Sequence, residues 1–541
     1  MADGIGRASA LLASGTLVSR ILGFVKAFLL AQTIGVLVVG NTFSIANQLP
    51  NNIYVIIGGG VLTAVLVPQI VRAGLHADGG NAYVNKLLTI TIVFIGGLTI
   101  IATAIAPVFV WIYAATLPDD QFALATAFAY WCLPQILFYA LYTVLGEVLN
   151  ARKMFGPFTW APVINNVVSI AGLAAFVLLY GSDASGHRAL SEWTPDMIAL
   201  IAGSATLGVV LQAAVLFLFW RRAGLKFRFD FQWRGVGLRA TGKVASWTFG
   251  MLLLTTLAGI VETQVAAVAS GGGASTAILQ NAWLIFMLPH SIITVSIATA
   301  YFTRMSEHGR GHDGSGPDVT SLRSDVSAAI RTVSVFIVLA TAVLIVVAQP
   351  FASFFTQSYS TTVAMGWIIV AFVVGLVPFC ILFIVQRAFY ALSDTKTPFF
   401  FTLFQTVLFT AMALVIGFTF PKPVIGVGVA GAISIACIAQ LALAAWLLRR
   451  RLGGLDLRRI VPSLIRFAIA AVPAVLVGWF VLGLLGGTEQ GGFGLSSLVG
   501  AAVTMLVVGA VMAAVYIALL AAFRAPELKA AIEPIRARLG R

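Results

Sequence analysis

Two short stretches decide the fold: NQLPNNIYVI at residues 47–56 and FMLPHSIITV at residues 286–295. Each places a Leu-Pro pair in the middle of an apolar run, and the second follows the first by about 240 residues. VLNARKMFGPF (148–158) and FYALSDTKTPF (389–399) recur at a similar interval as polar loops closed by proline. WRRAGLK (220–226) and LRRRLGG (448–454) form a third pair. Three pairs in the same order indicate an internal repeat.

The composition around this repeat is that of a membrane protein. Hydrophobic residues make up 60% of the 541 residues and charged residues only 10%, and the mean hydropathy is +1.00. Soluble proteins carry about a quarter charged residues, so a soluble enzyme, a disordered chain and a disulfide scaffold are excluded. Cys132, Cys380 and Cys437 lie in apolar stretches, and we expect them to be free and structural.

Apolar runs of about 20 residues or more predict membrane-spanning helices, and the fold class is therefore an all-α polytopic membrane protein. Fourteen spans are predicted, at residues 9–33, 39–72, 86–113, 121–149, 158–180, 197–220, 244–268, 276–303, 329–355, 362–391, 397–419, 424–448, 463–486 and 493–523. Arg20 and Lys26 lie within the first run, which is too long for a cleaved signal peptide.

The repeat divides these spans into two lobes. Six spans per repeat is an even number, so both lobes enter the membrane from the same side and are related by an axis along the bilayer normal. We expect two six-helix lobes facing a central cavity. The predicted domains are an N-terminal lobe at 1–239, a C-terminal lobe at 240–459, two appended spans at 460–523 and a cytoplasmic tail at 524–541.

The basic residues explain the net charge of +14 and predict the orientation. Loops after even-numbered spans are rich in Lys and Arg, most densely at residues 221–243, whereas loops after odd-numbered spans hold only Arg188 and Lys422. Lys and Arg are retained on the cytoplasmic side during insertion. The pattern therefore places both termini in the cytoplasm and excludes nucleic acid as a partner.

The recurring prolines suggest gates. Pro50 and Pro289 each remove a backbone hydrogen bond and bend the helix, which suits helices lining a central opening, although tolerated kinks are also common in membrane helices. Gly58, Gly59 and Gly60 come shortly after Pro50 and serve either as a hinge or for close packing.

Charged groups inside the membrane cost roughly 2.5 to 3.5 kcal/mol on insertion scales. Arg20 and Lys26 fit one broad cavity face or extend to the headgroup layer. Glu262, in the middle of the seventh span, is either a cation or proton site or a protonated, hydrogen-bonded carboxyl. His290, directly after Pro289, adds positive character to the cavity or is a satisfied core residue.

Side-chain amides concentrate on the second span, which we expect to face water or a polar ligand. They are Asn41, Asn47, Gln48, Asn51 and Asn52. No catalytic motif, metal-spaced cluster or credible nucleotide loop is present in the sequence, which points to a transporter and not an enzyme. No cofactor is predicted, and an ion gradient, the membrane potential or the substrate gradient would drive transport.

Four segments resemble the lipid II flippase family (MurJ or MviN) of the multidrug/oligosaccharidyl-lipid/polysaccharide exporter superfamily. They are SRILGFVKAFLLAQTIG (19–35), NQLPNNIY (47–54), VLGEVLNARKMFGPFTWAPVINNV (144–167) and VQRAFYALSDTKTPFF (385–400). The resemblance implies a bacterial plasma membrane and the transfer of undecaprenyl-diphosphate-linked disaccharide pentapeptide, lipid II or a related polyprenyl-diphosphate lipid, from the inner to the outer leaflet by alternating access. Lipid II and membrane lipids would be its partners, together with cell-wall synthesis or division proteins.

The same resemblance bears on the sites. Arg20 and Lys26 match two cationic positions of the family, and His290 is the nearest basic side chain to a third. Because they concentrate on the second span, we add the amides Asn47, Gln48, Asn51 and Asn52 to the headgroup cavity. Leu284 stands where the family places a cavity arginine on the eighth span, so the cationic set is reduced. Ala413 replaces a sodium-site amide, which leaves Glu262 and Gln405 for Na⁺ or H⁺ coupling.

Three alternatives remain open at this point. The chain could flip another polyprenyl-linked glycan. It could be a cation-coupled drug exporter that uses Glu262, although Arg20 and Lys26 would repel cations. It could also be a paralogue that does not transport and instead scaffolds the cell-wall machinery, because cavity cations are missing.

Overall fold

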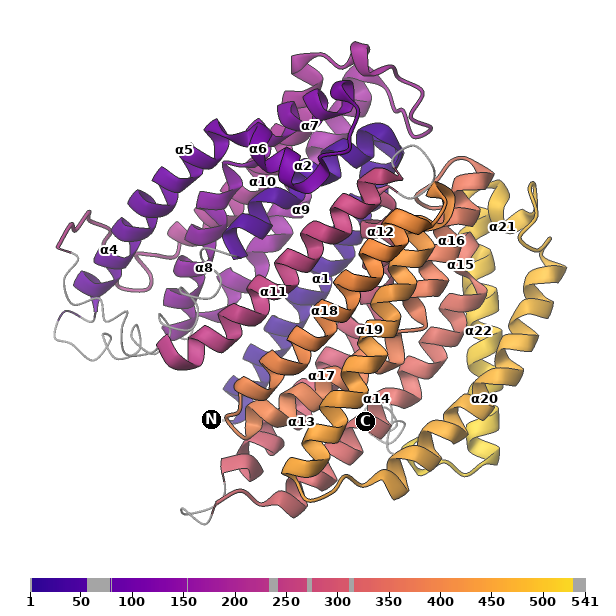
Figure 1. The fold of residues 1–541 in the computed structure, drawn as a ribbon. Coiled ribbons are helices and arrows are strands. Elements are labelled where there is room, and N and C mark those ends of the chain that lie inside the picture. Colours follow the sequence, from indigo (N-terminus) through magenta and orange to yellow (C-terminus); the bar gives the residue numbers. More distant parts are fainter. Residues whose placement is uncertain are drawn as a thin grey trace. The chain divides into compact units, whose positions relative to one another are not determined.

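The computed structural model describes residues 2–55, 78, 80–152, 154–232, 242–269, 275–310 and 316–528. All regular structure in these ranges is helical (Figure 1). The chain packs as two compact units, the first comprising Met1–Gly271 and Ser275–Ala277, and the second Gly272–Ala274 and Ile278–Arg541. The predicted lobe boundary at 239/240 lies outside the described residues, and the division into lobes stays a prediction.

The first unit contains the long helices of the first seven spans. They are α1 (Ala2–Ile34), α2 (Val38–Tyr54), α4 (Asn81–Ile90), α5 (Gly96–Ala104), α6 (Ala106–Ala114), α7 (Asp119–Cys132), α8 (Gln135–Ala151), α9 (Phe155–Tyr180), α10 (Pro195–Phe217) and α11 (Gly242–Val268). A π-helical turn at Thr91–Ile95 joins α4 to α5, and a short 3₁₀ turn at Leu190–Glu192 precedes α10.

The second unit contains the remaining spans. Its helices are α12 (Thr276–Pro289), whose first two residues belong to the first unit, α13 (Val295–Arg310), α14 (Val319–Val346), α15 (Ala348–Ala352), α16 (Tyr359–Val373), α17 (Leu376–Ala391), α18 (Lys396–Thr419), α19 (Lys422–Arg451), α20 (Leu457–Leu484), α21 (Phe493–Ser496) and α22 (Leu498–Ala522). A π-helical turn at His290–Thr294 joins α12 to α13.

Thirteen helical stretches in the described ranges are long and apolar enough to cross a membrane. The remaining predicted span, residues 39–72, begins as α2 and continues into residues outside the described ranges. The predicted all-α polytopic fold is therefore confirmed. The three cysteines are free and buried, as expected.

Hydroxyl groups and glycine set several helix ends. At the start of α10, the Thr194 side-chain oxygen accepts a hydrogen bond from the backbone N–H of Met197. Pro195, at the beginning of the helix, has no backbone N–H that would need an acceptor. Ser358 and Ser497 cap α16 and α22 in the same way. Gly35, with φ of +73°, directly follows α1, and a Cβ there would lie only 3.0 Å from the backbone oxygen of Ala184.

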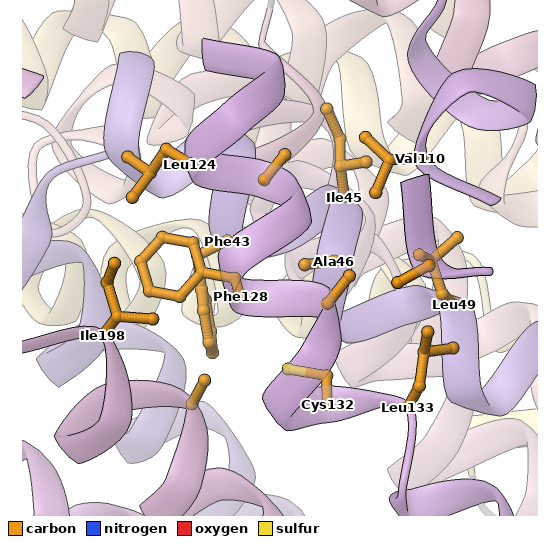
Figure 2. Packing of buried hydrophobic residues seen from close by; sticks show 14 of the residues in the cluster. Phe43, Ile45, Ala46, Leu49, Val110, Leu124, Phe128, Cys132, Leu133 and Ile198 are labelled. Carbon is orange, nitrogen blue, oxygen red and sulfur yellow. The ribbon is translucent and has the colours of Figure 1, made fainter. Parts of the chain in front are cut away.

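The core of the first unit is built around α2 and α7 (Figure 2). The ring of Phe43 meets the ring of Phe128 edge to face at 5.4 Å between centroids, and Phe128 in turn meets Trp193 at 5.7 Å. Leu49, one residue before Pro50, is fully buried in the same cluster. The second span is therefore anchored by apolar contacts along its described length.

In the second unit, the appended spans pack onto α14. Phe467 of α20 and Met512 of α22 are fully buried in one cluster with residues of α14. The hydroxyl of Tyr516 donates to the backbone oxygen of Val335 at 3.0 Å. Ionic contacts reinforce this packing, because Glu527, just after α22, pairs with Arg331 at 2.9 Å.

Candidate functional site

A cavity of about 570 Å³ opens in the first unit between α1, α8 and α9. Its walls combine one cation with hydroxyl, amide and aromatic groups. The lining residues are Thr16, Ser19, Arg20, Tyr142, Asn150, Phe158, Thr159 and Pro162. This volume falls within the range of small-molecule binding pockets, roughly 300 to 1,000 Å³.

Arg20 is the one charged residue in this lining, and its side chain is exposed. The helix that carries it is held closely to α9. The Asn166 side chain donates to the backbone oxygen of Ser19 at 2.9 Å, and Gly15 lets α1 approach the side chains of Thr159 and Trp160. Arg20 thus extends from a closely packed pair of helices, which fixes the point from which its side chain enters the cavity.

Tyr142 and Phe158 form the aromatic wall. Their rings stack at 5.0 Å with an interplanar angle of 15°, and the Tyr142 hydroxyl donates to the backbone oxygen of Phe158 at 3.1 Å. Gly146 makes the stack feasible, because a Cβ at that position would overlap the Phe158 ring. The cavity therefore offers a cation beside polar groups and a flat apolar surface, a combination suited to a phosphorylated, sugar-bearing headgroup.

Lys26 lies on the same helix as Arg20 but not in this lining. Six helical residues separate them by about 9 Å along the axis. Its side chain is partly buried, and no hydrogen bond or ion pair to it is found within the described ranges. The assignment of Lys26 to the headgroup site stays a prediction.

The amides of α2 are partly used in helix contacts. Asn47 Oδ1 lies 3.5 Å from the donor Gln135 Nε2 on α8, and Gln48 Nε2 donates to Thr263 Oγ1 on α11 at 3.3 Å. Asn51 is exposed and Asn52 is partly buried. None of the four amides lines the cavity of Arg20, so their role in headgroup binding stays a prediction.

His290 is buried in the second unit, with 4% of its surface exposed. Its ring meets Phe379 at 4.7 Å and Phe383 at 5.1 Å, both edge to face, and Nδ1 lies 3.5 Å from the Cys380 sulfur. This environment is that of a core histidine and offers no support for contact with a headgroup.

The two prolines occupy different places in their helices. Pro289 ends α12 and leads directly into the π-helical turn His290–Thr294, so the regular α-helical geometry changes at this proline. The predicted bend and gating role of Pro289 stay predictions. Pro50 is buried inside α2. Gly58, Gly59 and Gly60 lie outside the described residues, and their role as a hinge stays a prediction.

Glu262 and Gln405, the predicted coupling residues, lie on α11 of the first unit and α18 of the second. Both side chains are partly buried. In the described part of the chain, no hydrogen bond or ion pair to the Glu262 carboxylate is found. The same part of the chain contains no group of three or more His, Cys, Asp or Glu that could hold a metal ion.

Sequence reasoning missed most of the cavity wall. Thr16, Tyr142, Asn150 and Thr159 line it together with Arg20, yet each is an ordinary polar residue near the end of a predicted span. Asn150 and Thr159 lie within residues 144–167, one of the segments that resemble the family, and Tyr142 lies two residues before this segment. That stretch marks the site better than the isolated charges do.

Comparisons with known proteins point to one family. A family model described as lipid II flippase MurJ matches residues 30–521. The probable lipid II flippase MurJ of Rickettsia prowazekii (strain Madrid E) is 27% identical over 433 residues, which cover 76% of this chain and 78% of that protein. The probable lipid II flippase MurJ of Haemophilus influenzae (strain ATCC 51907 / DSM 11121 / KW20 / Rd) is 25% identical over 490 residues, covering 86% and 90%.

Solved structures show the same fold. The structure of lipid II flippase MurJ in an inward closed conformation matches with a TM-score of 0.71 at 19% identity, covering 93% of this chain and 98% of that chain. An inward-facing multidrug resistance MATE family transporter of the MOP superfamily matches with a TM-score of 0.61 at 15% identity, covering 80% and 94%. Because the family model spans most of the sequence, the chain belongs to the lipid II flippase MurJ family.

Proposed function

We propose that this chain moves lipid II from the cytoplasmic to the outer leaflet of the bacterial plasma membrane by alternating access. Family membership supports this function and does not favour the drug exporter or the scaffold without transport activity. The observation that carries the proposal is the position of Arg20 in a cavity otherwise lined by hydroxyl, amide, aromatic and proline side chains.

Arg20 would bind the diphosphate. Its guanidinium presents a planar set of donors that matches phosphate oxygens two at a time. The hydroxyls of Thr16, Ser19 and Thr159 add further donors, and the stacked Tyr142 and Phe158 provide a surface for a sugar ring. The polyprenyl tail would remain in lipid. Fixed donors in the cavity lower the cost of moving an anionic headgroup through the bilayer core.

The test is transport of fluorescent lipid II in proteoliposomes, together with growth of a flippase-depleted strain. Hydrogen bonds to charged groups are worth about 1.5 to 3 kcal/mol, so R20A is expected to lower transport by roughly 10- to 150-fold. R20K keeps the charge but loses the paired donors, and it should fall between R20A and wild type. R450A is the matched control, because Arg450 is exposed and stacks over Trp446 on α19.

The proposal fails if correctly inserted R20A protein transports lipid II at the wild-type rate and supports full growth. Loss of transport in R450A as well would indicate a general effect of removing basic charge. Failure of the wild-type protein to move lipid II while it moves another polyprenyl-linked glycan would keep the fold and change the substrate.

The proposal includes the orientation of the chain. The excess of Lys and Arg in loops after even-numbered spans supports cytoplasmic N and C termini. Reporter fusions at Arg188 and at Arg222 test it, since the first should report the outer side and the second the cytoplasm. Association with cell-wall synthesis or division proteins stays a prediction.

Coupling to Na⁺, H⁺ or the membrane potential is a further part of the proposal. A partly buried carboxylate on a spanning helix is costly unless a cation or proton neutralises it, which supports Glu262 as the coupling group. E262Q removes the charge and keeps the shape. It should abolish the dependence of transport on an imposed ion gradient, and unchanged gradient dependence would remove Glu262 from this role.

A further inference from the structure

Residues 225–231, here named the strap, follow α10 and lie along α4 from Asn81 to Thr89 (Figure 1). Backbone N–H groups at every second strap residue donate to side-chain oxygens one helical turn apart on α4. The three pairs are Lys226 with Asn81 Oδ1 at 3.2 Å, Arg228 with Asn85 Oδ1 at 3.2 Å, and Asp230 with Thr89 Oγ1 at 2.9 Å. Leu225, buried to 1% exposure, fixes the start.

The spacing of these three bonds shows that the strap is extended. Four helical residues advance about 6.0 Å, and two residues of an extended chain advance about 6.6 Å. The two intervals match closely enough for successive donors to meet successive acceptors. Because side chains alternate along an extended chain, Phe227, Phe229 and Phe231 lie on one side of the strap. Lys226, Arg228 and Asp230 lie on the other side, where the Asp230 carboxylate already accepts the backbone N–H of Gln232 at 2.9 Å.

The phenylalanines form a continuous and exposed aromatic row. Centroid distances are 5.0 Å between Phe227 and Phe229 and 6.2 Å between Phe229 and Phe231, and Phe217 at the end of α10 extends the row at 6.5 Å. The strap rings are 38%, 55% and 63% exposed in chain order. Exposed apolar rows of this kind mark interaction sites.

The position of the strap identifies what covers the rings. The strap lies where two spanning helices end, because α10 stops at Phe217 and the span containing α4 begins at Asn81. By the length and composition of these helices, this level corresponds to the boundary between acyl chains and headgroups. Lys226 and Arg228 are exposed on the side of the strap opposite the rings, and Arg221 and Arg222 precede them. In the proposed orientation this is the cytoplasmic side, where these basic residues meet an anionic membrane surface.

We propose that the strap is an interfacial anchor that places the rings of Phe227, Phe229 and Phe231 among the acyl chains of the cytoplasmic leaflet and binds the phosphates of anionic phospholipids through Lys226 and Arg228. The bonds to α4 hold the anchor at a fixed depth. The occupant is thus a phospholipid such as phosphatidylglycerol, selected by charge, and not the transported substrate.

The first test measures depth in nanodiscs that contain phosphatidylglycerol. Nitroxide labels are placed one at a time by K226C, F227C, R228C, F229C and F231C, which is practical because the three native cysteines are buried. Labels at 227, 229 and 231 should collide more with oxygen than with a water-soluble nickel chelate, and labels at 226 and 228 should do the reverse. Absence of this alternation, or shielding of the rings from both reagents, overturns the proposal.

The second test identifies the lipid. A phosphatidylglycerol with a photoreactive acyl chain should crosslink to strap peptides more than the matching phosphatidylcholine does. Each basic residue near an anionic surface changes binding about fivefold, so K226Q and R228Q should each lower phosphatidylglycerol crosslinking by that factor. K422Q, an exposed lysine at the start of α19, is the matched control.

Equal crosslinking of the two lipids, or no effect of K226Q and R228Q, would overturn the anionic selection. Both tests read the position of the strap and its lipids without measuring transport. Their failure would leave the proposed flippase function untouched, and failure of transport would leave the anchor untouched.

Discussion

The hydroxyl of Tyr54, on α2, donates a hydrogen bond of 2.7 Å to the hydroxyl of Thr143, on α8. Two helical turns earlier, Asn47 approaches Gln135 of the same helix. Gln135 also donates to Thr206 at 2.9 Å and accepts from Tyr139 at 3.2 Å. The polar contacts between α2 and α8 thus lie on both sides of Pro50, so any bending of α2 at this proline must break or carry along the contacts on one side.

We expect Y54F to destabilise the protein by about 0.5 to 1.5 kcal/mol, because it removes one hydrogen bond. Q135A should cost more, because it empties a buried position and removes the hydrogen bonds of Gln135 to several partners at once. Thermal unfolding in detergent measures both. Y130F, at an exposed tyrosine of α7, is the control. If Q135A were no more destabilising than Y54F, the network around Gln135 would contribute little to holding α2.

The π-helical turn after Pro289 gives a second prediction. In P289A the backbone regains a donor and loses the ring clash, a change worth up to about 3 kcal/mol in a helix interior. We therefore expect P289A to keep or raise thermal stability while lipid II transport falls, because the gate loses its break. P473A, in α20 of the appended spans, should leave transport unchanged. Normal transport by P289A would remove this break from the gating mechanism.

Close packing of α9 and α10 gives a third prediction. A Cβ at Gly208 would lie 2.5 Å from Asn165 Oδ1 and 2.8 Å from the backbone oxygen of Asn165, so the helices would have to separate. G208A should destabilise the protein by about 1 to 3 kcal/mol. G97A is the matched control, since nothing lies within 4 Å of its Cβ. Equal melting temperatures for the two variants would contradict the predicted overlap.

Glu527 gives a prediction about pH. Burial of its carboxyl raises the pKa, but hydrogen bonds from a backbone N–H, Ser463 and Arg331, and the charge of Arg331, outweigh burial and bring the pKa below the ordinary value of 4.5. A carboxyl with a lower pKa in the folded state stabilises the fold above its unfolded pKa. This stabilisation is lost as the pH falls through the lower, folded value.

E527Q removes this contribution. We expect it to melt at a lower temperature than wild type at pH 7, with a loss of about 1.5 to 3 kcal/mol for a hydrogen bond between charged groups. The difference should shrink as the pH falls below about 4.5. E489Q, at an exposed glutamate after α20, should show neither effect. A pH-independent difference between E527Q and wild type would mean that the carboxylate charge is not what stabilises this contact.

Local sequence pattern was sufficient for the spans. Apolar runs reveal spanning helices because each span must be apolar along its length. The change to π-helical geometry after Pro289 is consistent with the missing N–H of proline. The π-helical turn Thr91–Ile95 was not predicted, since TIVFI contains neither proline nor glycine and is typical of a continuous helix. The contacts of the α2 amides with other helices were not predicted either: Asn47 lies near Gln135 on α8, and Gln48 donates to Thr263 on α11.

The remaining features depend on pairs that are far apart in the chain. Arg331 and Glu527 are separated by 196 residues, and Asn166 and Ser19 by 147. The sequence around either residue of such a pair contains no local pattern that indicates the other residue. The charge of Arg20 was visible in the sequence, but its neighbours in the cavity were not, because three helices bring them together. The contacts of His290 with the rings of Phe379 and Phe383 likewise join residues that are far apart in the chain.

The bonds between the strap and α4 also set an order of assembly. The third span enters the membrane with the acceptor side chains Asn81, Asn85 and Thr89. The backbone N–H groups that donate hydrogen bonds to them lie 141 to 145 residues further along the chain. At the usual synthesis rate of about 5 to 20 residues per second, the wait is roughly 7 to 30 seconds. During biogenesis the start of this span is therefore an incomplete surface, and the ribosome must synthesise the strap, beyond the sixth span, before the first unit can complete its packing.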